Sequence, residues 1–282
     1  MQAVISRLNI FPVKSLKGIQ VQQAKCFETG LEYDREWVIV DDKNLFITQR
    51  QFPMMATIST AITDSHLVLS HPSQEDLLIP LESSVKNKAE GQEIIVWKDK
   101  IQAIHEGKAA SEWLTQTLKC KKGSLHLVRF PADEKRIVLP KYTQSTDAKL
   151  KFADACPYLI VNNASLDALN AELLQRGNKA VDLARFRGNI EISNIEAWQE
   201  YECNTMLINK VQLKAEAPCH RCPMPGINQE TGETPEPGQP FKTLMEIDMP
   251  KGKSGAYFGM HATFISGNAE SISVGDSLAL ET

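Results

Sequence analysis

Residues 35–48 read Arg-Glu-Trp-Val-Ile-Val-Asp-Asp-Lys-Asn-Leu-Phe-Ile-Thr, and this stretch decides the fold class. The runs at residues 37–40 and 45–48 are short, apolar and rich in β-branched or aromatic side chains, which favour strands. Turn-forming residues at 41–44 separate them, so the stretch predicts a β-hairpin. A chain organised around such hairpins is expected to be mainly β.

Similar short apolar runs recur on both sides of this hairpin. In the first half, strands are expected at residues 3–13, 56–63, 66–70, 77–81, 93–97 and 101–105. This spacing is typical of a β-barrel or sandwich. In the second half, strands are expected at residues 125–130, 157–161, 189–193, 205–216, 262–266 and 271–280. Helical periodicity is confined to residues 108–118 and to a stretch around Leu169 that Gly177 ends.

The chain has 282 residues, which predicts two domains at roughly 150 residues per domain. The boundary is expected after the helix at 108–118, so that residues 1–121 form an N-terminal domain and residues 122–282 a second one. Residues 223–254 are rich in proline and glycine. An irregular segment of that length is usually functional or mobile.

Charge and composition narrow the function classes. Lys and Arg number 31 against 35 Asp and Glu, a net charge of −4, which argues against a nucleic-acid-binding role. The chain has no apolar run of about 18 residues and does not begin with a signal peptide, so we expect a cytoplasmic protein with no membrane span. Its six cysteines include one close pair and predict free thiols or ligands.

The segment Cys219-His220-Arg221-Cys222 is the densest group of reactive side chains. A cysteine beside Arg and His is favoured as a thiolate, which binds metals. A structural zinc site lacks a second cysteine pair, and Pro223 prevents the helix that a thioredoxin-like pair needs. Two unpaired loop cysteines are a further reading. In the fourth interpretation, one of the two cysteines ligates a transition metal as a thiolate. A cofactor carries this metal and supplies its other ligands.

Basic residues beside hydroxyl or amide groups mark places where an anionic cofactor would bind. Lys14 and Ser15 follow the first expected strand, Arg50 follows the hairpin, and Arg187 and Asn189 precede another strand. Guanidinium binds two phosphate oxygens at once and ammonium adds a point charge. Each place alone is also what an ordinary solvated surface charge would give.

Several motifs occur in one order along the chain: Lys14-Ser15, Arg50, Phe152-Ala153-Asp154, Phe186-Arg187-Gly188-Asn189-Ile190, Cys219-His220-Arg221-Cys222 and Ser271-Ile272-Ser273-Val274-Gly275-Asp276. Together they resemble the MOSC-domain proteins that carry a MOSC N-terminal β-barrel domain. The resemblance covers nearly the whole chain and extends to the mitochondrial amidoxime reducing components and their bacterial relatives that reduce hydroxylated purines. It implies a mainly β (α+β) fold with a β-barrel MOSC domain packed against an N-terminal barrel-like domain.

The resemblance also implies the site. It makes Cys222 the molybdenum ligand and Cys219 a bystander. It places the molybdenum cofactor (molybdopterin) contacts at Lys14, Ser15, Arg50, Asp154, Cys156, Arg187, Asn189, His220, Arg221 and Cys222. Arg221 or His261 would supply a proton or hold the leaving oxygen.

The implied function is two-electron reduction of N-hydroxylated compounds: hydroxylamines, N-hydroxylated bases and amidoximes. The cysteines give no set of four for an iron–sulfur cluster. Electrons are therefore expected from a separate protein, either ferredoxin, flavodoxin or a cytochrome b5-like protein with its reductase. The family is also associated with detoxification and with pyridoxal phosphate binding.

Two other functions are also compatible with the sequence. In addition, the sequence departs from the family pattern at two places. One alternative is a carrier of molybdenum cofactor or sulfur without turnover, and the other is a zinc module using Cys219 and Cys222. The family pattern is interrupted by residues 223–226, which puts substrate specificity in question. Gly188 replaces the proline of the family motif, and a looser site is expected there.

Overall fold

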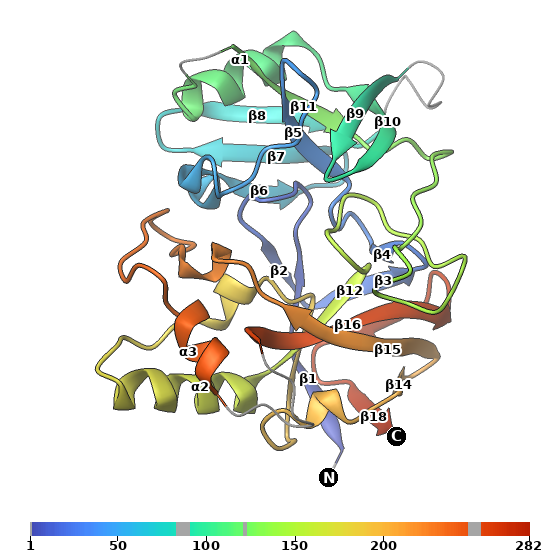
Figure 1. The fold of residues 1–282 in the computed structure, drawn as a ribbon. Helices are drawn as coiled ribbons and strands as arrows, with labels where there is room; N and C mark the ends of the chain where they lie inside the picture. The colour runs from blue at the N-terminus through green and yellow to red at the C-terminus, as the bar shows by residue number, and fades with distance from the viewer. Residues whose placement is uncertain (1, 83–90, 121–122, 248–254) are drawn as a thin grey trace.

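Two β-rich parts lie one above the other in the computed structural model, which describes every residue except 1, 83–90, 121–122 and 248–254 (Figure 1). The expected mainly β class is confirmed. The lower part is a closed barrel and the upper part consists of smaller sheets with one helix at the top.

Seven of the described strands close the lower barrel in the order β13-β12-β16-β15-β14-β18-β1. Strand β1 pairs with both β18 and β13, and this double pairing closes the ring. Closure leaves none of these strands as an unpaired edge. The bounds are β1 Ala3–Ile10, β12 Tyr158–Asn162, β13 Ile190–Ser193, β14 Thr205–Ile208, β15 Val211–His220, β16 Tyr257–Ser266 and β18 Ser277–Glu281. Strand β2 (Ile19–Val21) extends the sheet beside β1.

The barrel interior is filled by alternate side chains of its strands. In β1, Ala3, Ile5, Leu8 and Ile10 are buried and pack in one core with Phe186 and Phe258. The period of two holds on each side of an irregularity between Ile5 and Arg7, where the pairing with β13 shifts register and the inward positions move to Leu8 and Ile10. The short strands β3 (Gln23–Phe27), β4 (Gly30–Leu31) and β17 (Ser271–Ser273) form a small sheet at the barrel's side.

The upper part holds two further sheets. One has the order β5-β11-β10-β9 and the other β6-β7-β8. Their bounds are β5 Trp37–Asp41, β6 Ser59–Ile62, β7 His66–His71, β8 Gln74–Pro80, β9 Gln92–Val96, β10 Asp99–His105 and β11 Leu125–Arg129. Helix α1 (Lys108–Thr117) buries Trp113 and Leu114 in the core that these sheets share with Trp37.

Two more helices lie beside the barrel (Figure 1). Helix α2 (Asn163–Gln175) begins at Asn162, whose side chain accepts a hydrogen bond from the Ala164 amide and so caps the helix. Helix α3 (Phe241–Glu246) lies within the segment expected to be irregular. Residues 248–254 of that segment lie outside the described residues.

Three expected elements differ in the structure. The second arm of the opening hairpin forms only isolated bridges, Val40 to Phe46 and Leu45 to Ile95. The expected strand at 205–216 is two strands, β14 and β15, and the one at 271–280 is β17 and β18. In each pair a tight turn interrupts an apolar pattern that continues across it.

The sheets cross the predicted domain division. Strand β1 completes the lower barrel, while β11, from the second half of the chain, pairs with β5 and β10 in the upper part. The division itself, between residues 121 and 122, falls outside the described residues. It stays a prediction.

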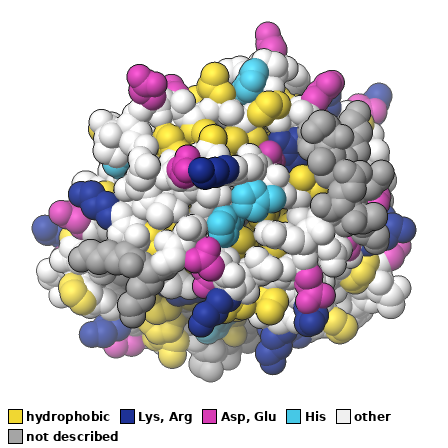
Figure 2. Space-filling view, turned by 90° about the horizontal axis from the view of Figure 1, so that it is seen from above, with side chains coloured by type: hydrophobic (Ala, Val, Ile, Leu, Met, Phe, Trp, Pro, Cys, Tyr) yellow, Lys and Arg dark blue, Asp and Glu magenta, His cyan; other side chains and the backbone are white. Residues whose placement is uncertain are grey.

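The surface of the upper part carries mixed charge. On the face seen from above, Lys and Arg side chains alternate with Asp and Glu (Figure 2). Among the described residues, every helix is too short or too polar to cross a bilayer.

Candidate functional site

A cavity of about 90 Å³ lies where the first turns of the chain meet the mouth of the barrel. Eight residues expected at the site from the sequence line it: Lys14, Ser15, Asp154, Cys156, Arg187, Asn189, Arg221 and His261. Arg35 and Cys219 line it as well. The structure thus brings together residues up to 247 positions apart in the sequence, as 261 − 14 gives.

The chain holds three of these residues in left-handed backbone. Ser15 has φ 70°, Arg35 has φ 46° and Arg187 has φ 55°. Such values are uncommon for residues other than glycine and are often found at functional sites. Ser15 follows the turn that comes after β1. Arg187 directly follows the 3-10 turn Leu183–Phe186. The cavity wall therefore contains residues in strained backbone.

The cations of the cavity are held mostly by neutral oxygens. Arg187 Nη1 donates to the Leu16 carbonyl at 2.8 Å, and Arg221 Nη2 donates to the Phe186 carbonyl at 2.9 Å. Burial and the neighbouring Arg35 lower the pKa of Arg187 to about 9. Buried charges without a carboxylate partner are costly, so the cavity favours an anionic ligand.

Lys14 forms the principal ion pair at the cavity. Its Nζ donates to Asp154 Oδ1 at 2.6 Å and to the Phe152 carbonyl at 2.7 Å. Burial lowers the pKa of Lys14 to about 8, against the opposing effect of Asp154. Burial raises the pKa of Asp154, but the ammonium of Lys14 outweighs it and holds that pKa well below its usual range.

Asp34 and Arg35 were missed by the sequence interpretation. Arg35 Nη1 lies 2.5 Å from Asp34 Oδ2 and 3.0 Å from Asn189 Oδ1, and its Nη2 donates to the Arg187 carbonyl at 3.0 Å. Both Arg35 and Arg187 stack on Phe11, at 4.3 and 4.2 Å from the ring centroid. The sequence feature that could have identified these two residues is an Asp-Arg pair close before the buried strand β5.

Cys219, which the resemblance makes a bystander to the metal, lines the cavity. Its Sγ lies 3.1 Å from Arg221 Nη1. Burial alone would raise the pKa of the thiol, but Arg221 and His261 lower it to about 6. Arg221 and His261 therefore favour the thiolate form of Cys219. Cys156 behaves in the opposite way, because burial raises its pKa and keeps it a neutral thiol.

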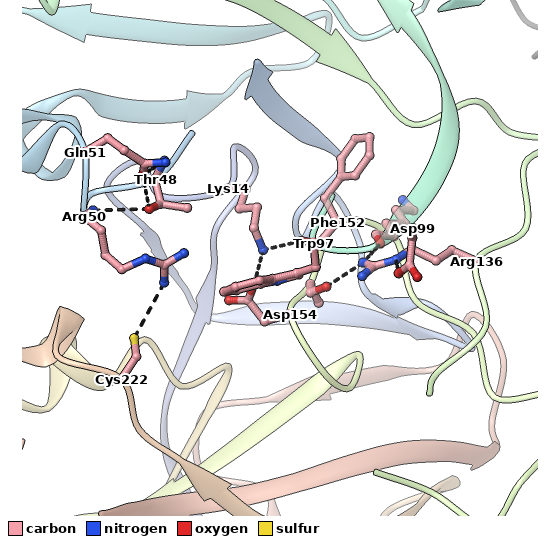
Figure 3. A network of polar contacts seen from close by, with 12 residues as sticks. Lys14, Thr48, Arg50, Gln51, Trp97, Asp99, Arg136, Phe152, Asp154 and Cys222 are labelled. Carbon is pink, nitrogen blue, oxygen red and sulfur yellow. Dashed lines mark hydrogen bonds and ion pairs between the residues drawn. The ribbon is translucent and has the colours of Figure 1, made fainter. Parts of the chain in front are cut away.

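Cys222 and Arg50 meet beside the cavity. Arg50 extends from the turn after the hairpin and places Nη1 3.8 Å from Cys222 Sγ (Figure 3). Its guanidinium also stacks on Trp97 at 5.0 Å, and Trp97 Nε1 donates to Asp154 Oδ1 at 2.7 Å. The upper part of the molecule thus reaches Cys222 through Arg50.

His220 is not brought to the cavity. Alternation along the end of β15 turns Cys219 and Arg221 inward and leaves the His220 side chain exposed, where it packs on Tyr257 at 5.3 Å. Asn189 lines the cavity, but its Oδ1 already accepts from Arg35 and from the Leu159 amide. Asn189 therefore joins the barrel strands to the cavity wall.

The loosening expected at Gly188 is not found. A Cβ atom at this position would lie 2.5 Å from Val161 Cγ2. Glycine allows the segment after Arg187 to approach β12 closely, and the wall is tightly packed there.

No group of three or more His, Cys, Asp or Glu side chains is arranged to hold a metal ion within residues 2–82, 91–120, 123–247 and 255–282. In the same described part, Arg221 Nε and His261 Nδ1 are buried without a hydrogen-bond partner. Both residues line the cavity. The site therefore offers positive charge and unused polar groups, but no complete ligand set for a bare metal.

These features define a class: a β-barrel protein with a cationic, anion-accepting cavity flanked by two cysteines. The chain belongs to the MOSC-domain proteins, since a MOSC N-terminal beta barrel domain matches residues 2–121 and a MOSC domain matches residues 147–279. The resemblance drawn from the sequence motifs is confirmed.

Curated relatives agree with this assignment. The chain is 31% identical to mitochondrial amidoxime-reducing component 1 of Homo sapiens and 30% identical to that of Mus musculus, each over 98% of the chain and 82% of the relative. It is 28% identical to the molybdenum cofactor sulfurase of Bombyx mori, over 92% of the chain and 32% of that protein.

Proposed function

We propose that this protein is a molybdenum-cofactor-dependent reductase of N-hydroxylated compounds, among them hydroxylamines, N-hydroxylated bases and amidoximes. One observation carries the proposal: Lys14, Arg35, Arg187 and Arg221 converge on one cavity beside the Cys219–Cys222 segment. The names of the relatives, an amidoxime-reducing component and a molybdenum cofactor sulfurase, support both the substrate class and the cofactor.

The residues present fit the cofactor's anionic end. A cavity of about 90 Å³ is smaller than the roughly 300 Å³ that drug-sized ligands occupy, so it suits a phosphate group. Arg187 and Arg221 would bind its oxygens, and the unpartnered Nε of Arg221, noted above among the described residues, is available for one such bond. Cys222, 3.8 Å from Arg50, would supply the thiolate ligand on the open side of the site.

The bound cofactor supplies the two-electron redox chemistry, and the protein supplies orientation and electrostatics. In the overall reaction the N–O bond breaks, two electrons and two protons are consumed, and an amidoxime gives an amidine and water. His261 would hold a proton at Nδ1, the atom with no partner among the described residues, and Arg221 would orient the departing oxygen.

Electrons would come from a separate donor of the ferredoxin, flavodoxin or cytochrome b5-like type. We further propose a cytoplasmic location and a role in detoxifying N-hydroxylated compounds. The six cysteines, all within the described residues, form no disulfide and are compatible with a reducing compartment.

The test combines metal analysis with turnover. Protein purified from a host that makes the cofactor is expected to contain molybdenum and to reduce benzamidoxime with a reduced artificial electron donor. Cys222→Ser should lose both molybdenum and activity, whereas Cys219→Ser should retain molybdenum. Zinc in place of molybdenum, or loss of molybdenum in Cys219→Ser but not in Cys222→Ser, would contradict the proposal.

A carrier of cofactor or sulfur is the second candidate, and the Cys219 thiolate favours it. A thiol with a pKa of about 6 beside Arg221 is suited to hold a persulfide. A molybdenum-loaded protein that reduces no N-hydroxylated compound, but passes its cofactor to an apo-enzyme, would establish this function instead.

A further inference from the structure

Trp97 has a left-handed backbone conformation, which is unfavourable for a residue with a bulky side chain. Strands β9 and β10 pair Val96 with Asp99, which leaves a two-residue loop of Trp97 and Lys98. Trp97 has φ 58°. Such loops favour Gly, Asn or Asp, and a left-handed conformation is strained for a bulky residue. Turn formation therefore does not account for a tryptophan at this position.

The contacts of Trp97 connect this loop to the candidate site. Its Nε1 donates to Asp154 Oδ1 at 2.7 Å, and the Arg50 guanidinium lies 5.0 Å from its ring centroid. Figure 3 shows Lys14 and Trp97 meeting at Asp154, with Arg50 extending toward Cys222. Trp97 thus touches two residues of the site although it lies on a hairpin of the upper part.

An apolar groove of about 550 Å³ has Trp97 in its wall. Its apolar lining comprises Leu45, Phe46, Ile47, Phe52, Ile95, Trp97 and Leu125. The Phe46 ring lies 5.1 Å from the Trp97 ring, tilted by 54°. The volume falls within the range of about 300–1,000 Å³ typical of small-molecule sites, which are mostly apolar and aromatic.

The groove and the site adjoin each other through two neighbouring residues. Gln51 lines the groove, and Arg50, the residue before it, contacts Cys222 Sγ. Trp97 itself lines the groove and stacks on Arg50, so a ligand lying against Trp97 is separated from Cys222 by the Arg50 side chain. Because the lining near Trp97 is aromatic, a planar ring would gain offset or edge-to-face contacts that a short aliphatic group cannot make.

We infer that this groove binds the planar aromatic portion of an N-oxygenated substrate, with Trp97 and Phe46 as the contacting rings and Leu45 at its wall. This inference rests on the proposed function and specifies its substrate class. Aromatic amidoximes are then preferred over small aliphatic ones.

Tryptophan fluorescence tests binding without turnover. Trp97 is 49% exposed, whereas Trp37, Trp113 and Trp198 are 0%, 8% and 9% exposed, so an aromatic ligand in the groove should quench Trp97 first. Titration with benzamidine, with no electron donor present, is expected to give saturable quenching that disappears in Trp97→Phe. Quenching that persists unchanged in Trp97→Phe would overturn the inference.

Leu45→Ala and Leu78→Ala form a matched pair of variants. Both leucines are exposed, at 41% and 57%, but only Leu45 lines the groove, while Leu78 lies on β8. Leu45→Ala should weaken benzamidine binding and lower kcat/KM for benzamidoxime several-fold, and Trp97→Ala about tenfold. For acetamidoxime, which has no ring to place in the groove, both losses should be smaller than for benzamidoxime, and Leu78→Ala should change none of these values.

The outcomes separate this inference from the proposed function. Reduction of both amidoximes with equal losses in Leu45→Ala and Leu78→Ala would refute the groove and leave the reductase intact. Trp97-dependent benzamidine binding by a protein that reduces neither amidoxime would refute the reductase and leave an aromatic-binding groove. Trp97→Ala lowering kcat/KM equally for both substrates would also count against the groove, since it would indicate an effect through Asp154 alone.

Discussion

At the scale of residues, the site depends on how buried charge is compensated. Lys14 and Arg35 each have a carboxylate partner, Asp154 and Asp34, whereas Arg187 and Arg221 are held by carbonyl oxygens. Carbonyl oxygens fix the position of a guanidinium without neutralising it. Arg187 therefore supplies the main attraction for an anion, while Arg221 also contacts Cys219 Sγ at 3.1 Å, and the two ion pairs keep the surrounding wall in place.

Asp154→Asn tests the compensation of Lys14. Because Asp154 is 54% exposed, solvent screens part of the pair, and we expect a loss of about 1–2 kcal/mol in the free energy of unfolding at pH 7. The pKa of Asp154 is lower when folded than its ordinary 3.8, so its contribution is present above pH 3.8 and is lost as the pH falls below it. Urea unfolding from pH 7 to pH 3 should show the two proteins converging at the acidic end. A constant difference across this range would exclude the carboxylate charge as the cause.

Arg187→Gln tests the anion-binding role. Sulfate or phosphate binding to the cofactor-free protein should raise its Tm, because a ligand that binds only the folded state stabilises it. The increase should be reduced by at least half in Arg187→Gln. Arg176→Gln, which alters an exposed arginine paired with Glu172 on α2, should keep the full increase. Equal anion effects in both variants would place the anion site elsewhere.

At the scale of elements, single strands and caps decide which side chains face the site. The end of β15 turns Cys219 and Arg221 into the cavity and His220 out of it. Helix α2 is anchored differently: its cap Asn162 donates to buried Glu200 at 2.9 Å, and Ser165 Oγ donates to the same carboxylate at 2.8 Å. This cluster fixes the start of α2 against the 3-10 turn Gln199–Tyr201.

Glu200→Gln tests this anchor through pH. Burial raises the pKa of Glu200 above its ordinary 4.5, so the folded state binds more protons just above pH 4.5 and stability falls as pH rises through the folded pKa. The variant lacks this titration. Its free energy of unfolding should therefore rise relative to that of the parent between pH 4.5 and 7. The exposed neighbour Glu202, changed to Gln, should show no such trend. If the free energy of unfolding changed with pH in the same way in all three proteins, titration of Glu200 would not be the cause.

At the scale of the whole molecule, closure of the barrel links the two ends of the sequence. Strand β1 pairs with β13 and β18, and Lys14 follows β1 directly into the cavity. The barrel and the site therefore both require the N-terminal segment.

A fragment of residues 122–282 tests this dependence. Without β1 the barrel has two open edges, at β13 and β18, and loses the core side chains Ile5 and Leu8. We expect the fragment to be insoluble or to unfold without a cooperative transition, measured by circular dichroism during heating. The full chain is the control. A soluble fragment with a cooperative transition would support a domain division that allows the second part to fold alone.

The sequence by itself determined the mainly β class, most strand positions, the two-domain family and the list of cations, because apolar alternation and ordered motifs are local properties. It did not determine that β1 closes the barrel, that Asp34-Arg35 joins the site, that Cys219 faces the cavity, or that Trp97 adjoins an apolar groove. Those features depend on pairings between distant segments, such as β1 with β13, and on burial, which shifts pKa values only after the chain has folded. Tertiary structure therefore decided which of the charged and thiol side chains meet.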